Sequence, residues 1–149
     1  MHQFIFSSGE WLGQGQLTFS DSPNKMYFYT KWQITEAANG VILCQQFIER
    51  QGIESDLLIN LYRFSNINEG IFDIALESEL LGSVQGKGKY TNALISWEFM
   101  TPMSFNDTSG FKGIEEYQIE EKGGYLLKAV YDSEGHLTMV NGQIWKKHS

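Results

Sequence analysis

The alternation of side chains over residues 9–20 constrains this chain more than any other feature. Odd positions carry apolar side chains and glycines, and even positions are mostly polar: Trp11, Gly13, Gly15, Leu17 and Phe19 against Glu10, Gln14, Gln16, Thr18 and Ser20. A period of two residues is that of a β-strand with one buried and one wet face. The two glycines on the apolar face leave room for close backbone approach and a sharp bend, as a strand curving around a closed barrel requires.

Ten strand-like segments follow along the chain, most of them with the same alternation, while 41–50 starts apolar on both faces and 56–64 is apolar on both faces. They cover residues 9–20, 25–35, 41–50, 56–64, 71–77, 83–90, 93–100, 111–120, 125–132 and 136–147. The connections are short and carry hairpin signals such as Asn39-Gly40, and no segment keeps a helical period over three turns. Ten sequential hairpin strands would leave two long edges exposed unless the sheet closed on itself. The sequence therefore predicts an all-β, antiparallel up-and-down β-barrel of about ten strands, with an open sandwich as the alternative.

The length of the chain and the position of the first strand-like segment predict the domain organisation. The 149 residues match one domain, spanning 1–149, in which residues 1–8 form an N-terminal lid or tail. The longest aperiodic segment, residues 101–110, is predicted to be a loop at the mouth of the barrel.

Charge and composition exclude several classes of function. The formal net charge is −7 and the only arginines are Arg50 and Arg63, so no basic stripe is present for a nucleic acid or an anionic membrane. No apolar run is long enough to span a bilayer, and residues 1–8 do not resemble a signal peptide. Cys44 is the single cysteine, which fits a reducing compartment. The expectation is a cytoplasmic protein that binds no nucleic acid and does not insert into membranes, and that could form a homo-oligomer.

The triplet Gly9-Glu10-Trp11 at the start of the first segment resembles the signature of the calycin group, which comprises lipocalins, fatty-acid-binding proteins and nitrobindins. The longer pattern of Gly9, Trp11, Gly13 and Gly15 is similar to the opening of nitrobindins and of small bacterial lipocalin-like barrels with no assigned activity. Lipocalin-like bilin lyases also carry the triplet. The resemblance implies that Trp11 packs across one end of the barrel, beneath a basic side chain from the last strand, Lys146 or Lys147.

Known chemistry-bearing motifs are absent from the sequence. The nitrobindin resemblance implies haem held by a histidine near the end of the chain, but His2, His136 and His148 are scattered and are predicted to be solvent-exposed without a metal. Cys44 is expected to be a small core residue, and no nucleophile motif is present. The sequence therefore favours a barrel without catalytic residues of a known type, without a metal site and without a cofactor, and it disfavours haem.

Polar and aromatic side chains that the pattern could place inside the barrel form the candidate site. The wall is predicted to contain Trp32, Trp97, Tyr117 and Tyr131. Arg63 is the candidate anchor for a ligand carboxylate, as the resemblance to fatty-acid-binding proteins implies. An arginine at the rim, paired with Glu98 or Glu115, is the alternative. Other polar residues on strands with apolar neighbours are Gln46, Arg50 and Tyr62.

Three functions follow from these candidates. The first is an uncharacterised lipocalin-like barrel that binds a small hydrophobic ligand in its interior. The second is a cofactor-free enzyme or a chaperone for a reactive intermediate, of the lipocalin-like lyase type, in which interior Glu98 or Glu115 moves a proton. The third is a barrel filled by its own side chains, acting through its surface or as an oligomer.

Overall fold

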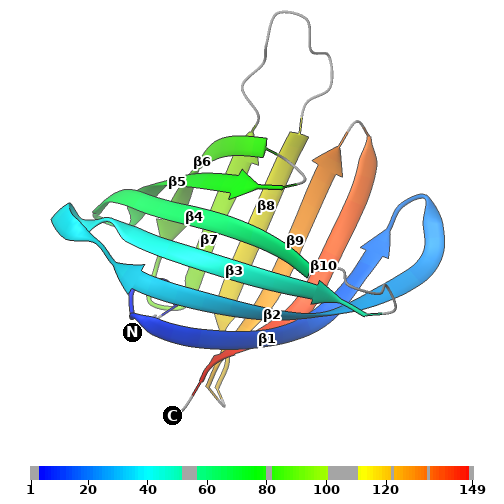
Figure 1. Cartoon of the computed structure of the whole chain (residues 1–149), viewed down its shortest axis with the longest axis horizontal. Helices are drawn as coiled ribbons and strands as arrows, with labels where there is room; N and C mark the ends of the chain where they lie inside the picture. Colours follow the sequence, from blue (N-terminus) through cyan, green and yellow to red (C-terminus); the bar gives the residue numbers. More distant parts are fainter. Residues whose placement is uncertain are drawn as a thin grey trace, which may run out of the picture.

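A computed structural model describes residues 4–51, 57–79, 82–100, 111–121, 123–133 and 135–147, and these form a closed barrel (Figure 1). The strands are β1 (Gly9–Phe19), β2 (Ser22–Glu36), β3 (Ile42–Arg50), β4 (Leu57–Asn68), β5 (Ile71–Ser78), β6 (Gly82–Tyr90), β7 (Leu94–Met100), β8 (Phe111–Ile119), β9 (Tyr125–Ser133) and β10 (His136–Lys146). Each strand pairs antiparallel with its sequence neighbours, and β1 pairs with β10 to close the ring. The predicted all-β, up-and-down barrel is thus confirmed, and the open sandwich is wrong.

β2 and β4 are longer than the sequence pattern predicted by three residues or more. β2 begins at Ser22 because the turn after β1 is very short. β4 continues to Asn68, although the stretch rich in Asn and Gly from residue 65 onward predicted a loop. The pairing of β4 with β5 shifts register between Ser65 and Asn68, and Asn66 has a positive φ of 51°. A β-bulge therefore accommodates the positive φ of Asn66, which does not fit a regular ladder, and the strand continues beyond it.

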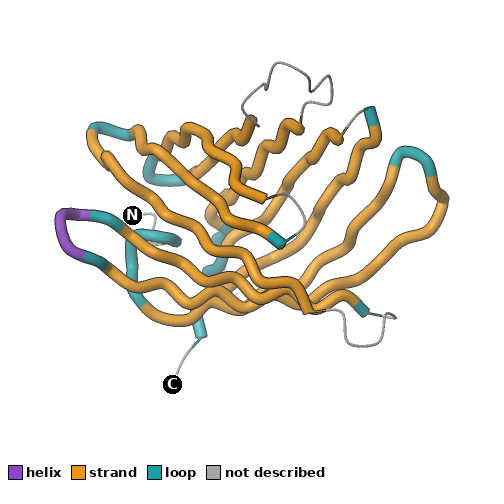
Figure 2. The backbone as a smooth tube through the Cα atoms, turned by 45° about the horizontal axis from the view of Figure 1, so that its top comes forward, coloured by secondary structure: helices purple, strands orange, loops and turns teal. Residues whose placement is uncertain are grey.

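The alternation of side chains sorts residues between the barrel interior and its outer surface. Inward-facing side chains form one continuous core that includes Trp32, Phe64, Trp97 and Tyr117. The interior has two different ends. The end where β2 passes into β3, which carries the short 3-10 turn Ala38–Gly40, also receives the N-terminal segment (Figure 2). The opposite end, where β1 meets β2 and β3 ends, is the mouth.

Trp11 lies at the closed end, where it is 2% exposed and packs against the rings of Phe4 and Tyr125. Lys146 is its partner in the register of β1 and β10, but the Lys146 ammonium donates to Ser7 Oγ at 3.0 Å. The ammonium of Lys147 bonds Glu10 at 3.1 Å instead. Lys146 at the end of β10 therefore contacts the N-terminal segment, and Lys147, the next residue, contacts β1.

Glycines are needed where two strands approach closely. A Cβ at Gly13 would lie 2.6 Å from Ile144 Cγ2 and 2.9 Å from the backbone oxygen of Gln143, so only glycine fits there. A Cβ at Gly86 would overlap the backbone oxygen of Glu98 on the neighbouring strand β7. The glycines on these inward faces permit the curvature that closes the barrel.

Replacing Gly86 by alanine is expected to destabilise the barrel, because β6 and β7 must separate to accept the methyl group. Overpacking of this kind costs about 1–3 kcal/mol in the free energy of unfolding. Gln85→Ala is the control, since Gln85 is exposed on the same strand and its loss should cost within about 0.5 kcal/mol. Urea unfolding followed by tryptophan fluorescence measures both, and equal midpoints for the two variants would contradict the close contact.

Candidate functional site

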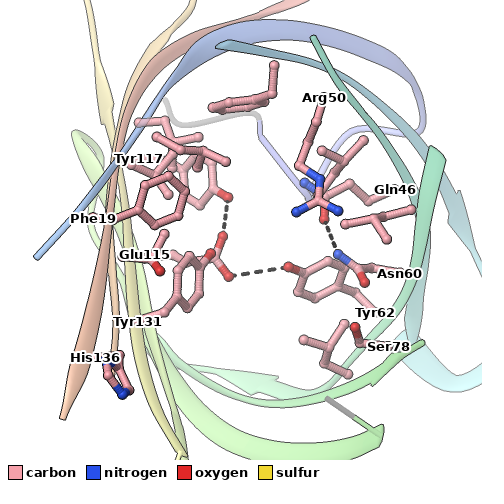
Figure 3. Close-up of a pocket in the computed structure, with 18 residues that line it drawn as sticks. Phe19, Gln46, Arg50, Asn60, Tyr62, Ser78, Glu115, Tyr117, Tyr131 and His136 are labelled. Atoms are coloured by element: carbon pink, nitrogen blue, oxygen red, sulfur yellow. Dashed lines mark hydrogen bonds between the residues drawn. The ribbon is translucent and has the colours of Figure 1, made fainter. Parts of the chain in front are cut away.

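A cavity of about 300 Å³ occupies the mouth half of the barrel (Figure 3). Its wall is mostly apolar, with Leu17, Phe19, Phe28, Ile48, Leu58, Leu76, Leu127 and Val140. Its polar lining is Gln46, Arg50, Asn60, Tyr62, Ser78, Glu115, Tyr117, Tyr131, His136 and Thr138. Small-molecule sites commonly combine apolar surface with polar groups that fix the orientation of the ligand.

Glu115 on β8 is the centre of the polar side of the cavity. Its side chain is 2% exposed, and three hydrogen bonds converge on its carboxylate. Tyr117 OH donates to Oε1 at 2.7 Å, Trp97 Nε1 donates to Oε2 at 2.8 Å, and Tyr62 OH donates to Oε2 at 3.2 Å. Tyr131 is a further hydrogen-bonding neighbour of the same carboxylate. Strands β4, β7, β8 and β9 thus each contribute a side chain to one acidic group.

Burial dominates the electrostatics of this cluster. Desolvation raises the pKa of Glu115 above its ordinary value, and the hydrogen bonds from Tyr117, Trp97, Tyr62 and Tyr131 offset part of that rise. Desolvation, reinforced by the nearby Glu115 charge, raises the pKa of each of the three tyrosines well above the ordinary value. The phenols therefore stay neutral donors, and Glu115 is the group of this cluster that keeps its proton to a higher pH than an exposed glutamic acid does.

The wall facing this cluster carries amides and a cation. Gln46 Nε2 donates to Thr30 Oγ1 at 3.3 Å, and Asn60 Nδ2 donates to Gln46 Oε1 at 3.0 Å. Arg50 lies two residues after Ile48 on β3 and therefore faces the same side of the strand. Its guanidinium extends into the cavity beside Gln46 and Asn60 (Figure 3). The cavity thus has a carboxyl on one wall and a guanidinium on the other.

Two candidates from the sequence lie outside the barrel. Arg63 is exposed on the outer face of β4, together with Leu57 and Leu61. Glu98 is exposed on the outer face of β7, where Lys87 and Ile114 flank it in the register. Placing both Trp97 and Glu98 in the interior was wrong, because adjacent residues of a regular strand point to opposite faces. The arginine that lines the cavity is Arg50 and not Arg63, because Arg50 shares the inward parity of Cys44, Gln46 and Ile48.

The other candidates face inward but divide between two regions. Trp97, Glu115, Tyr117 and Tyr131 lie in or beside the carboxylate cluster of the cavity. Trp32 is buried deeper, stacked on Tyr62 with ring centroids 5.1 Å apart. Sequence reasoning did not commit to Tyr62 or Asn60, although both share the parity of inward Phe64.

The histidines do not form a metal centre in the described part of the chain. His136 begins β10 at the rim of the cavity, with its Nδ1 2.9 Å from Asp21 Oδ2. His2 and His148 lie outside the described residues, as does the loop predicted at 101–110. Within the described ranges, no group of three or more His, Cys, Asp or Glu side chains could hold a metal ion. Cys44 is buried in the core, and burial raises the pKa of its thiol.

The closed ring of antiparallel strands and its inward-facing side chains define a β-barrel of calycin-like fold. Among solved structures, the S-type phycobiliprotein lyase CPES from Guillardia theta aligns with 98% of this chain and 92% of its own, with a TM-score of 0.54 and 9% sequence identity. That likeness is one of fold. No family model and no curated protein matches the chain. None of the described residues forms a helix of the length and hydropathy that crossing a membrane requires.

The raised pKa of Glu115 predicts a specific dependence of stability on pH. Between the ordinary glutamate pKa of 4.5 and the raised pKa in the barrel, the folded protein holds a proton that the unfolded chain has lost. The free energy of unfolding therefore falls as pH rises through this window, by at most about 1.4 kcal/mol per pH unit.

The variant Glu115→Gln should abolish this contribution, so the difference in unfolding free energy between wild type and variant should change across the window. Glu98→Gln is the matched control, because that carboxylate is exposed on the neighbouring strand. Urea unfolding at a series of pH values from acidic to neutral measures the three proteins. A constant difference between wild type and E115Q would show that burial leaves the Glu115 proton unaffected.

Proposed function

We propose that this barrel binds a small, largely apolar molecule that carries a carboxylate, and that Arg50 is the anchor for that group. The observation that carries the proposal is an arginine side chain on the wall of a cavity whose surface is largely apolar, opposite the Glu115 cluster. A guanidinium pairs with a carboxylate through parallel N–H donors, and such charge-assisted bonds are strong where water is excluded. The apolar wall takes the body of the ligand.

The wall opposite Arg50 would select the other end of the ligand. There the phenols of Tyr62, Tyr117 and Tyr131 surround the Glu115 carboxyl group, and burial favours the protonated form of that group. A second anionic group would be repelled once Glu115 ionises, so the preferred ligand has one acid group. The open cavity argues against the third function considered, a barrel filled by its own side chains.

The cytoplasm remains the proposed compartment, supported by a single cysteine that is buried as a thiol. Some hydrophobic side chains stay exposed on the outer face, including Leu57, Leu61 and Ile71. As a further part of the proposal, copies of the chain associate into a homo-oligomer in which these exposed side chains become buried.

A binding titration with cis-parinarate and its methyl ester tests the anchor. The wild type is expected to bind the acid more tightly than the ester, with a rise in probe fluorescence that saturates. Arg50→Gln should weaken binding of the acid about tenfold or more, the worth of a hydrogen-bonded charge, and leave the ester almost unchanged.

Arg63→Gln is the matched control, since it removes the same charge from the outer face of the barrel. It should bind both probes as the wild type does. Equal effects of R50Q and R63Q would mean that net charge alone matters, and wild type without saturable binding of either probe would refute the proposal.

A second candidate function is acid–base chemistry on an unsaturated ligand, which the position of Glu115 on the cavity wall favours. A carboxyl group whose pKa is raised by burial keeps its proton to a higher pH, and it can donate that proton to a bound ligand and recover one. Protonation of the conjugated chain at an inner carbon, followed by return of a proton from the flanking methylene to the Glu115 carboxylate, shortens the conjugated run. The absorption bands of bound parinarate should therefore move to shorter wavelength with time. The shift should be lost in Glu115→Gln and kept in Glu98→Gln. A spectrum that stays constant in the wild type would leave binding as the function.

A further inference from the structure

Phe4 fills the closed half of the barrel, although it belongs to no strand. Its side chain is fully buried, and its ring centroid lies 4.6 Å from that of Tyr117, 5.1 Å from Trp32, 5.3 Å from Trp11 and 6.0 Å from Tyr125. The backbone N–H of Phe4 donates to Tyr125 OH at 3.3 Å. An aromatic ring from the N-terminal segment thus occupies a pocket whose walls are four aromatic side chains of the barrel.

In the part of the chain that the structure describes, the two tryptophans that border this pocket each have a buried indole N–H without a hydrogen-bond partner. Within the described residues, Trp11 Nε1 and Trp32 Nε1 are buried side-chain atoms that make no hydrogen bond. Both tryptophans meet Phe4 edge-on, with interplanar angles of 73° and 82°. Buried N–H groups without an acceptor are rare because burial removes their bonds to water. The phenyl ring that fills the pocket offers no lone pair to either of them.

The backbone that holds Phe4 in place is strained. Ile5 has a φ of 62° and its side chain is fully buried. A β-branched residue in the left-handed region is a conformational outlier, since its Cβ crowds the backbone. The insertion of Phe4 is therefore opposed by the conformation of the next residue, and burial of the two side chains must outweigh that cost.

The pocket of Phe4 adjoins the cavity at the mouth. Tyr117 contacts Phe4 on one side and lines the cavity on the other, and Tyr62 lines the cavity while it stacks on Trp32. Tyr117 therefore borders both the cavity and the space that Phe4 fills.

We propose that the space filled by Phe4 is a second ligand subsite of the barrel, which takes a flat aromatic ring bearing a hydrogen-bond acceptor. The chain's own phenyl ring occupies this subsite in the absence of such a ligand. The incoming ring takes over the contacts with Tyr117 and Tyr125, and its acceptor bonds the N–H of Trp11 or Trp32. This subsite is separate from the Arg50 anchor, and its test uses neutral probes that carry no carboxylate.

The variant Phe4→Ala empties the subsite for a binding test with quinoline and naphthalene. The two probes have the same shape, but only quinoline carries a ring nitrogen that accepts a hydrogen bond. Near neutral pH, we expect F4A to bind both probes at least tenfold more tightly than the wild type, in which they must displace Phe4. Calorimetry and the quenching of tryptophan fluorescence both report the affinity.

The indole donors are tested by adding Trp32→Phe or Trp11→Phe to F4A. Phenylalanine keeps an aromatic ring and removes the N–H, so the ratio of quinoline to naphthalene affinity should fall about fivefold in at least one double variant, the worth of one hydrogen bond. Trp145→Phe added to F4A is the control. Trp145 is exposed on the outer face, so its loss should leave the ratio unchanged.

An unchanged ratio in both double variants would overturn the assignment of the indole donors, and equal probe affinities for folded F4A and wild type would overturn the subsite. Circular dichroism and thermal unfolding establish that each variant is folded. If F4A does not fold, Phe4→Leu replaces it and should show smaller gains in affinity of the same sign, while no gain in F4L would overturn the proposal. Binding of parinarate to Arg50 can fail or succeed independently of these outcomes.

Discussion

The pairing of β1 with β10 is the constraint on which the rest of the structure depends. The ladder runs from Trp11 opposite Lys146 to Phe19 opposite Thr138, and it leaves the first and last strands with no free edge. Once the ring is closed, every inward side chain must share one enclosed volume, so residues that are remote in sequence become neighbours. Glycines at positions such as Gly13 make the closure possible, because a Cβ there would collide with β10.

Closure also explains why a carboxyl group in the core is tolerated. An isolated ionised Glu115 would be costly to bury, since desolvation penalises the charge. Three donors from β4, β7 and β8, together with Tyr131, compensate part of this cost and fix the orientation of the carboxylate. Such a polar network lowers the stability of the folded barrel, and it places hydrogen-bonding groups in fixed positions on one side of the cavity.

The interior is divided into a filled half and a hollow half by the same aromatic side chains. Tyr62 and Tyr117 face the cavity on one side and the rings of Trp32 and Phe4 on the other. The closed end is therefore packed with aromatic rings. The mouth half contains an accessible cavity with a largely apolar surface, and polar side chains lie on two opposite sides of it. This division allows a barrel with few charged interior groups to combine a rigid base with a space for a ligand.

The sequence by itself determined the local rules of this protein, and only the tertiary structure decided which distant residues meet. Period-two alternation predicted the strands and the barrel, and it grouped Glu115 with Tyr117 on one face of a strand, because the pleat is a local property of the backbone. On β4 both faces are apolar enough that parity could not choose between Tyr62 and Arg63, and the inward arginine proved to be Arg50. The meeting of side chains from four strands at one carboxylate, and the insertion of Phe4, depend on register and closure, which act over the whole ring and leave no mark in any short stretch of sequence.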